Sequence, residues 1–220
     1  MAKRTFVWVT IVALAVVAVG VVTASNMAFK LNYRLDAAGA AAKSGTNTLA
    51  LPFNRQTGIA TANNLITDVG LANVLNVQQF VEATDTFNVY TGRKGTPSPD
   101  FNLSSGDANF VQMAAGVDYI VVGSDNPSLA VALNGPGAGS KSGTNFFAYV
   151  YHSTAPTAFD LMNDIGFASV TNVQNFVKTT DSYAVYTGRK GTPSANFNLV
   201  PGAGYFIQMG STVNYVPSHY

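Results

Sequence analysis

The chain has 220 residues, of which 47% are hydrophobic and 10% are charged, and its formal net charge is +1. A disordered protein would be rich in charge and poor in apolar residues, and a nucleic-acid-binding protein would carry clustered positive charge, so the composition argues against both classes. The chain contains no cysteine and two histidines, which excludes disulfide scaffolds and thiol nucleophiles and argues against zinc sites built from cysteine or several histidines.

The first 24 residues have the pattern of a secretory signal peptide. Lys3 and Arg4 precede an uncharged apolar stretch over residues 6–22, and small residues at Val22 and Ala24 suit the −3 and −1 positions of a cleavage site. Cleavage there makes Ser25 the first residue of the mature chain. The apolar stretch has 17 residues, at the short end of the ~17–25 that cross a bilayer, so an uncleaved membrane anchor is the alternative. In both cases we expect the rest of the chain to leave the cytoplasm.

The remainder of the sequence is a tandem repeat. The motif at residues 43–47 returns at 141–145, and the eight residues 91–98 return unchanged at 187–194. Between residues 65–113 and their counterparts 96 positions later, 29 of 49 residues are identical. Each copy is long enough for its own core, and far longer than the ~20–50-residue unit of a solenoid. We therefore expect two homologous domains, at residues 25–124 and 125–220.

Each copy begins with an alternating segment, at residues 29–35 and 127–133, that is typical of a half-buried strand. Thr61 as N-cap and Gly70 as C-terminal stop predict one two-turn helix, and the second copy repeats both signals. The other strands expected in the first copy lie at residues 48–53, 74–81, 86–91, 101–103, 109–113 and 117–122. The sequence thus predicts a mainly β fold in which each copy is a small β-sandwich or open barrel with one short helix.

Duplicated basic pairs are the candidate ligand contacts. Arg93 and Lys94 return as Arg189 and Lys190, within loops rich in glycine and proline. A solvated hairpin tip is the alternative, because the flanking glycines explain the loop without any partner. No wider field of positive charge surrounds these pairs, so we expect no nucleic-acid binding.

Two pairs of aspartates also recur between the copies, Asp68 with Asp164 and Asp85 with Asp181. They raise the possibility of a two-carboxylate or calcium site, but each lies at a helix end or in a turn, where short polar side chains bond the backbone. The sequence has no calcium-binding loop of the EF-hand type and no Gly-x-Ser-x-Gly motif, and the two histidines are not related by the repeat. We therefore expect no catalytic residue, no metal and no cofactor, and a protein that is not an enzyme.

The second copy contains a series of short motifs: Asp164-Ile165-Gly166, Thr180-Asp181, Tyr186-Thr187-Gly188, Asn196-Phe197, Pro201-Gly202 and Gly204-Tyr205-Phe206. This series resembles a repeat of an uncharacterised family of secreted and surface-associated bacterial proteins. The resemblance covers both copies and implies an extracellular β-rich module, without catalytic residues to carry over. The first copy departs from it, with Ser105 in place of Pro201 and Asn109 in place of Tyr205.

A signal peptide, a low charge and two near-identical β domains favour an extracellular structural subunit that self-associates into a filament or a surface layer. One route is strand addition, in which an alternating N-terminal segment completes the sheet of a neighbouring subunit. The alternative keeps each strand in its own domain. The candidate interface residues are Phe29, Leu31, Tyr33 and Leu35 in the first copy, and Leu129, Val131 and Leu133 in the second.

The second hypothesis is a secreted adhesin or glycan-binding module. Its duplicated basic loops, together with aromatic residues on the strands, would give two-site avidity for a surface glycan. Aromatic residues at strand positions are also typical of a core or of a sheet surface. In both hypotheses the membrane is contacted only through the signal segment, and the expected partner is another copy of the chain or a glycan.

Overall fold

The computed structural model describes residues 28–51, 54–55, 58–93, 99–124, 129–137, 139–149, 151, 153–188 and 195–218. The predicted signal segment, the predicted domain boundary at residue 125 and the basic residues Lys94, Arg189 and Lys190 lie outside the described residues, as does the side chain of Phe29. Within the described chain, no helix combines the length and the apolar character needed to cross a membrane.

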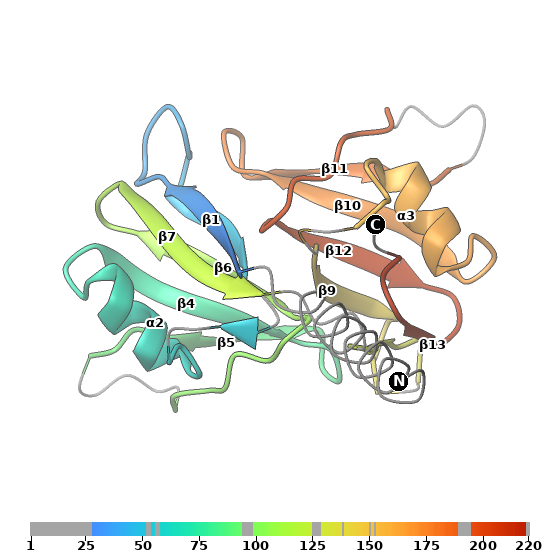
Figure 1. The fold of residues 1–220 in the computed structure, drawn as a ribbon, viewed down its shortest axis with the longest axis horizontal. Coiled ribbons are helices and arrows are strands. Elements are labelled where there is room, and N and C mark those ends of the chain that lie inside the picture. The colour runs from blue at the N-terminus through green and yellow to red at the C-terminus, as the bar shows by residue number, and fades with distance from the viewer. Residues whose placement is uncertain are drawn as a thin grey trace, which may run out of the picture.

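The first half of the chain forms two antiparallel sheets and one helix (Figure 1). One sheet has the order β1-β7-β3 and the other has the order β2-β6-β4-β5. The strands are β1 (Ala28–Leu35), β2 (Thr46–Ala50), β3 (Asn54–Arg55), β4 (Val74–Val81), β5 (Thr86–Tyr90), β6 (Ala108–Met113) and β7 (Val117–Ser124), and the helix is α2 (Ala62–Val69).

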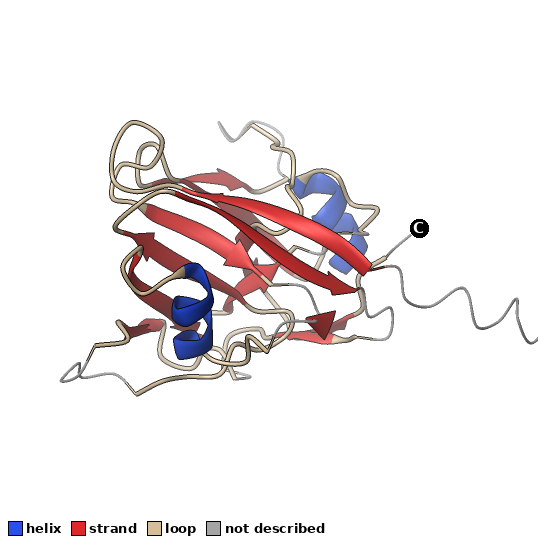
Figure 2. Ribbon diagram, turned by 60° about the vertical axis from the view of Figure 1, so that its left-hand side comes forward, coloured by secondary structure: helices blue, strands red, loops and turns tan. Residues whose placement is uncertain are grey.

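The second half repeats this arrangement with a shorter outer sheet. Its sheets have the orders β13-β8 and β11-β10-β12-β9, and both are antiparallel. The strands are β8 (Val131–Leu133), β9 (Thr144–Ala148), β10 (Val170–Val177), β11 (Ser182–Tyr186), β12 (Gly204–Met209) and β13 (Val213–Tyr215), and the helix is α3 (Ala158–Ile165). The two helices lie well apart, with strands between them (Figure 2). The predicted mainly β fold with one short helix per copy is confirmed, and its sheets stay open as in a sandwich.

Each half has a hydrophobic core of its own, because alternate residues of its strands face inward. In the first half, β1 pairs with β7 so that Leu31 lies opposite Val121 and Tyr33 opposite Tyr119, and all four are buried in one core. The buried residues of α2 have the spacing of a single helix face: Ala62, Leu65, Ile66 and Val69. The second core contains the equivalent residues between Val131 and Tyr215.

The helix ends follow the predicted capping pattern. The Thr61 side chain accepts a hydrogen bond from the Asn64 backbone N–H at 3.2 Å, and the Asn64 side chain accepts one from the Thr61 N–H at 3.2 Å. These reciprocal bonds are a capping box built with asparagine. Gly70 ends the helix with a φ of 103°, a backbone conformation that residues with a Cβ rarely adopt.

One local expectation is wrong. Residues 101–103 form no strand, and the only bridge there joins Asn102 to Thr61. Their backbone groups instead bond the residues around the start of the helix: Leu103 N–H donates to Ala60 O at 2.9 Å, and Ala62 N–H donates to Phe101 O at 3.0 Å. The alternation of Phe101 and Leu103 reflects packing against the first core from a connecting segment.

Candidate functional site: the junction between the two halves

The four-stranded sheets of the two halves pack face to face through a layer of phenylalanines. Phe146 stacks on Phe206 with ring centroids 4.2 Å apart, and Phe110 lies 4.8 Å from Phe146 and 5.1 Å from Phe176. Small residues from both halves complete this layer: Ala50, Ala108 and Ala148. Each four-stranded sheet is therefore covered on one face by its own core and on the other by the sister sheet.

The bonds across the junction come in equivalent pairs. When a residue of the first half donates to a residue of the second half, the equivalent residue of the second half donates to the equivalent residue of the first half. In the first pair of backbone hydrogen bonds, Lys43 N donates to Lys178 O and Lys141 N donates to Glu82 O. In the second pair, Ala50 N donates to Gly202 O and Ala148 N donates to Gly106 O. All four distances are 2.8 Å. This reciprocity is that of a two-fold interface, here formed within one chain.

Ala108 and Gly204 mark the centre of this approximate two-fold arrangement. The two residues are equivalent in the repeat, and they contact one another. A Cβ atom added at Gly204 would lie 2.3 Å from the Cβ of Ala108. The junction therefore has room for one methyl group at this point, and the two copies share it.

The duplicated aspartates of the β4–β5 and β10–β11 turns join the halves. Asp85 and Asp181 have positive φ values of 57° and 53°, which aspartate tolerates better than most residues. The Ser142 hydroxyl donates to Asp85 Oδ1 and the Ser44 hydroxyl donates to Asp181 Oδ1, both at 3.0 Å. The turn interpretation from the sequence thus describes their backbone, while their carboxylates bind the opposite copy.

The second pair of aspartates has a different partner. Asp68, near the end of α2, accepts a hydrogen bond from the Tyr119 hydroxyl of β7 at 2.7 Å, and Asp164 accepts the equivalent bond from Tyr215. Each bond fastens a helix to the outer sheet of its own half. Among the residues that the structure describes, no three histidine, aspartate or glutamate residues are placed to hold a metal ion.

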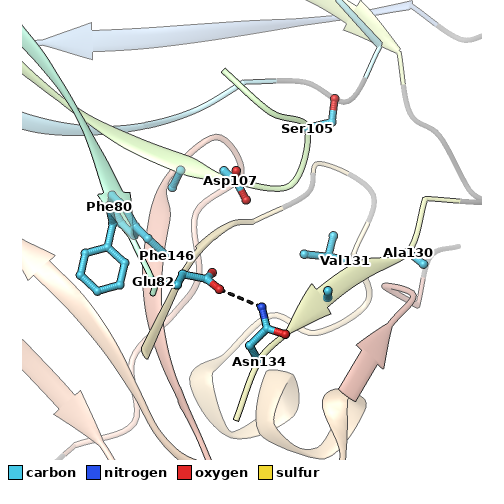
Figure 3. Close-up of a pocket in the computed structure, with 10 residues that line it drawn as sticks. Phe80, Glu82, Ser105, Asp107, Ala130, Val131, Asn134 and Phe146 are labelled. Carbon is cyan, nitrogen blue, oxygen red and sulfur yellow. Dashed lines mark hydrogen bonds between the residues drawn. The ribbon is translucent and has the colours of Figure 1, made fainter. Parts of the chain in front are cut away.

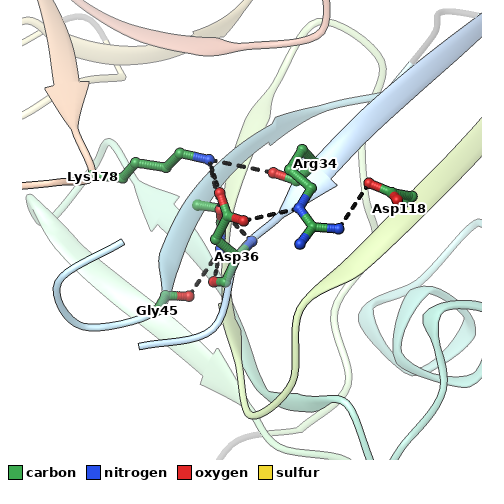
Figure 4. A network of polar contacts seen from close by, with 6 residues as sticks. Arg34, Asp36, Gly45, Asp118 and Lys178 are labelled. Atoms are coloured by element: carbon green, nitrogen blue, oxygen red, sulfur yellow. Dashed lines mark hydrogen bonds and ion pairs between the residues drawn. The ribbon is translucent and has the colours of Figure 1, made fainter. Parts of the chain in front are cut away.

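One end of the junction is an ion-pair network (Figure 4). Lys178 Nζ lies 2.6 Å from Asp36 Oδ2, and Arg34 Nε lies 3.0 Å from Asp36 Oδ1. Arg34 also binds Asp118 at 3.0 Å. The hydrogen bond from Lys178 lowers the pKa of Asp36, and Arg34 lowers it further. Because Lys178 belongs to the second half and Asp36 to the first, this network ties the halves together.

The other end holds the counterparts of these residues and is acidic (Figure 3). Asn134 replaces Asp36 and Glu82 replaces Lys178, and Asn134 Nδ2 donates to Glu82 Oε2 at 2.9 Å. Both residues line a cavity of about 280 Å³ together with Asp107. Burial raises the pKa of Asp107 to about 6. Burial also raises the pKa of Glu82, and the nearby Asp107 raises it further.

The candidate strand-addition residues lie within the cores of their own chain. Leu31, Tyr33 and Leu35 are buried in the first core, and Val131 and Leu133 are buried in the second, with Leu129 packed against it. Each of these strands thus lies in its own half of the single chain, and strand addition between chains stays a prediction. Arg93 is exposed at the end of a described segment.

The sequence reasoning did not find the junction. A usable signal was present in the two substitutions that change charge between otherwise similar copies, Asp36 to Asn134 and Glu82 to Lys178. No family model, no curated protein and no solved structure matches this chain. The resemblance to a secreted bacterial repeat therefore stays a prediction.

Proposed function

We propose that this chain is an extracellular structural subunit that self-associates through the outer edges of its four-stranded sheets. The observation that supports this proposal is the character of β5 and β11, each of which forms one edge of its four-stranded sheet, opposite the edge strands β2 and β9. Their sequences, TFNVY and SYAVY, contain no charge and no proline. Natural edge strands are normally protected by charged residues, proline or bulges, because an unprotected edge pairs with another chain. The extracellular location rests on the signal-like first 24 residues.

Both edges are accessible. Phe87 of β5 and Tyr183 of β11 expose 38% and 44% of their surface. Within the described residues, no backbone–backbone hydrogen bond joins β5 or β11 to any segment other than β4 or β10. By contrast, the edge strand β1 exposes Lys30 and Arg34, which protect it against pairing.

The two edges fit one another in an antiparallel register. With Asn88 of one chain opposite Ala184 of the next, Phe87 faces Val185 and Val89 faces Tyr183. Pairs of aromatic and β-branched residues are among the more favourable cross-strand neighbours, and no like charges meet. Because β5 and β11 are different strands, a single contact of this kind is heterologous, and where it does not close into a ring it extends into an open filament.

This route replaces the donation of an N-terminal strand. Donation of β1 to a neighbour would remove Leu31, Tyr33 and Leu35 from a core in which all three are buried. Fully burying one such apolar side chain contributes about 1.5–3 kcal/mol, so leaving the core unfilled would cost several times that amount. Pairing through β5 and β11 needs no such rearrangement.

The test compares negative-stain electron microscopy and sedimentation velocity of the mature chain with those of two double variants. The edge variant Asn88→Lys/Ala184→Lys places a charge at equivalent points of both edges. The control Ala115→Lys/Ser211→Lys adds the same charge at equivalent exposed turn positions. We expect filaments or sheets from the wild type and the control, and monomers from the edge variant. Monodisperse wild-type monomers would refute self-association, and equal assembly of the edge variant would refute the edge route.

A further inference from the structure

A second cavity lies at the ion-pair end of the junction, where the edge of β1 approaches the second half. Its volume is about 300 Å³, at the small end of the ~300–1,000 Å³ typical of ligand sites. Its base is held in place by two hydrogen bonds, from the Tyr33 hydroxyl to Ala50 O at 2.6 Å and from Ala50 N–H to Gly202 O at 2.8 Å. Gly202 packs so closely that an added Cβ would lie 2.7 Å from the Tyr33 ring. The cavity is therefore preorganised.

Besides Asn47, whose amide already donates to Asp36 O and Gly45 O, three side-chain amides line this cavity: Asn32 on β1, Asn175 on β10 and Asn198 on the segment between β11 and β12. Within the described residues, none of these three amides has a hydrogen-bond partner. Each carboxamide offers two donor hydrogens and one acceptor oxygen, which suits a ligand with hydroxyl groups that both donate and accept. The half-buried ring of Phe176 and the buried Tyr33 supply an apolar wall.

The charged residues at this cavity compensate one another. Lys178 and Arg34 both line it, and both are paired with Asp36, while Arg34 also binds Asp118. Two cations and two carboxylates sum to no net charge, so neither an anionic nor a cationic ligand has an unpaired counter-charge here. The polar chemistry left for recognition is that of the neutral amides.

We propose that this cavity binds one sugar unit of a neutral carbohydrate. The hydroxyl groups bond Asn32, Asn175 and Asn198, and the apolar face of the ring lies against Phe176 and the Tyr33 side of the cavity. This inference goes beyond the structural role and does not depend on self-association. It also differs from glycan binding through the duplicated basic loops, because it uses residues at the junction.

The equivalent cavity at the other end of the junction lacks these features. Ala130 stands in place of Asn32, and Gln79 stands in place of Asn175, with its amide already donating to Asn102 O at 3.1 Å. Phe146 replaces the small Thr48, and Glu82 adds an acid. Of the two junction cavities, only the one at the ion-pair end has these amides, and we expect a stoichiometry of one sugar per chain.

The test is isothermal titration calorimetry of the full mature chain with three neutral trisaccharides (cellotriose, maltotriose and chitotriose) and with an acidic one, trigalacturonic acid. The test variant is Asn175→Ala/Asn198→Ala, and its control is Gln79→Ala/Asn102→Ala, which truncates the equivalent residues of the first copy. We expect 1:1 binding of a neutral sugar that weakens at least about tenfold in the test variant, since each lost hydrogen bond weakens binding several-fold. The control should bind as the wild type does.

Thermal unfolding of both variants, followed by circular dichroism, shows whether each remains folded at the temperature of the titration. If the test variant does not, Asn32→Ala, an exposed position on β1, takes its place. Three results overturn the proposal: none of the three neutral trisaccharides binds at millimolar concentration, the folded test variant binds as well as the control, or trigalacturonic acid binds more tightly than every neutral trisaccharide.

Discussion

Replacing Gly204 with alanine tests whether the two halves pack about a shared axis. The added Cβ would lie 2.3 Å from Ala108 Cβ and 2.9 Å from Phe146 Cε2. The Phe146 atom belongs to the far end of a side chain and can shift, whereas Ala108 Cβ is fixed to the backbone of β6. Overpacking of this kind costs about 1–3 kcal/mol, offset by about 0.4–1 kcal/mol from the smaller entropy of the unfolded chain. We expect a net loss of about 1–2 kcal/mol, or about 2–8 °C in Tm.

The partner substitution Ala108→Gly distinguishes this cause from a general effect of the mutation. Alone, it should destabilise by about 0.5–1 kcal/mol, as glycine does in a strand. In the double variant, the methyl group has only moved from one copy to the other, so most of the strain disappears. The assay is urea unfolding of the four proteins, followed by circular dichroism and fluorescence. We expect a coupling free energy of at least about 1 kcal/mol.

Additive effects of the two substitutions would contradict this reasoning. If the two substitutions add within about 0.3–0.5 kcal/mol, residues 108 and 204 behave as distant, independent sites. That result would refute the contact between them and, with it, the approximate two-fold packing of the halves.

Three further predictions concern the polar residues. From about pH 4 to 7 the free energy of unfolding should fall by up to about 3 kcal/mol, because Asp107 has a pKa of about 6 in the folded state and near 3.8 in the unfolded state. Urea unfolding at several pH values measures this slope, and Asp107→Asn should flatten it. An unchanged slope in the variant would contradict the role of Asp107. Lys178→Glu should destabilise by about 1 kcal/mol or more by opposing two carboxylates at Asp36, and sodium chloride should reduce the loss. Tyr119→Phe keeps the ring but removes the hydrogen bond to Asp68, so it should lower the free energy of unfolding by about 1–2 kcal/mol and speed amide hydrogen exchange in α2. If neither quantity changes, the hydrogen bond does not hold the helix in place.

The sequence was sufficient for the architecture of each copy because the relevant signals are local. The strand predicted at residues 74–81 has the bounds of β4, and Thr61 with Gly70 predicts the limits of α2. The error at residues 101–103 has the same origin, since alternation reports burial and not the hydrogen-bonding partner of the backbone. A connecting segment that packs against a core gives the same pattern as a strand.

The junction was harder to predict because its contacts are distant in sequence and occur on a second buried face. Asp36 and Lys178 are separated by 142 positions. In β6, five of six residues are buried, so the strand shows no alternation that would separate its core face from the face that meets the sister sheet. Likewise, Asn32, Asn175 and Asn198 are ordinary surface residues in the sequence, and only folding brings them to one cavity.

The unequal ends of the junction bear on how the gene can change. An exchange of sequence between the two copies would make them uniform. A chain made from two first copies would set Asp36 opposite Glu82 and a second alanine against Ala108. A chain made from two second copies would lose the carboxylate that pairs with Lys178. We expect each homogenised product to be less stable than the present chain, because each would lose the complementarity between the two copies at the junction.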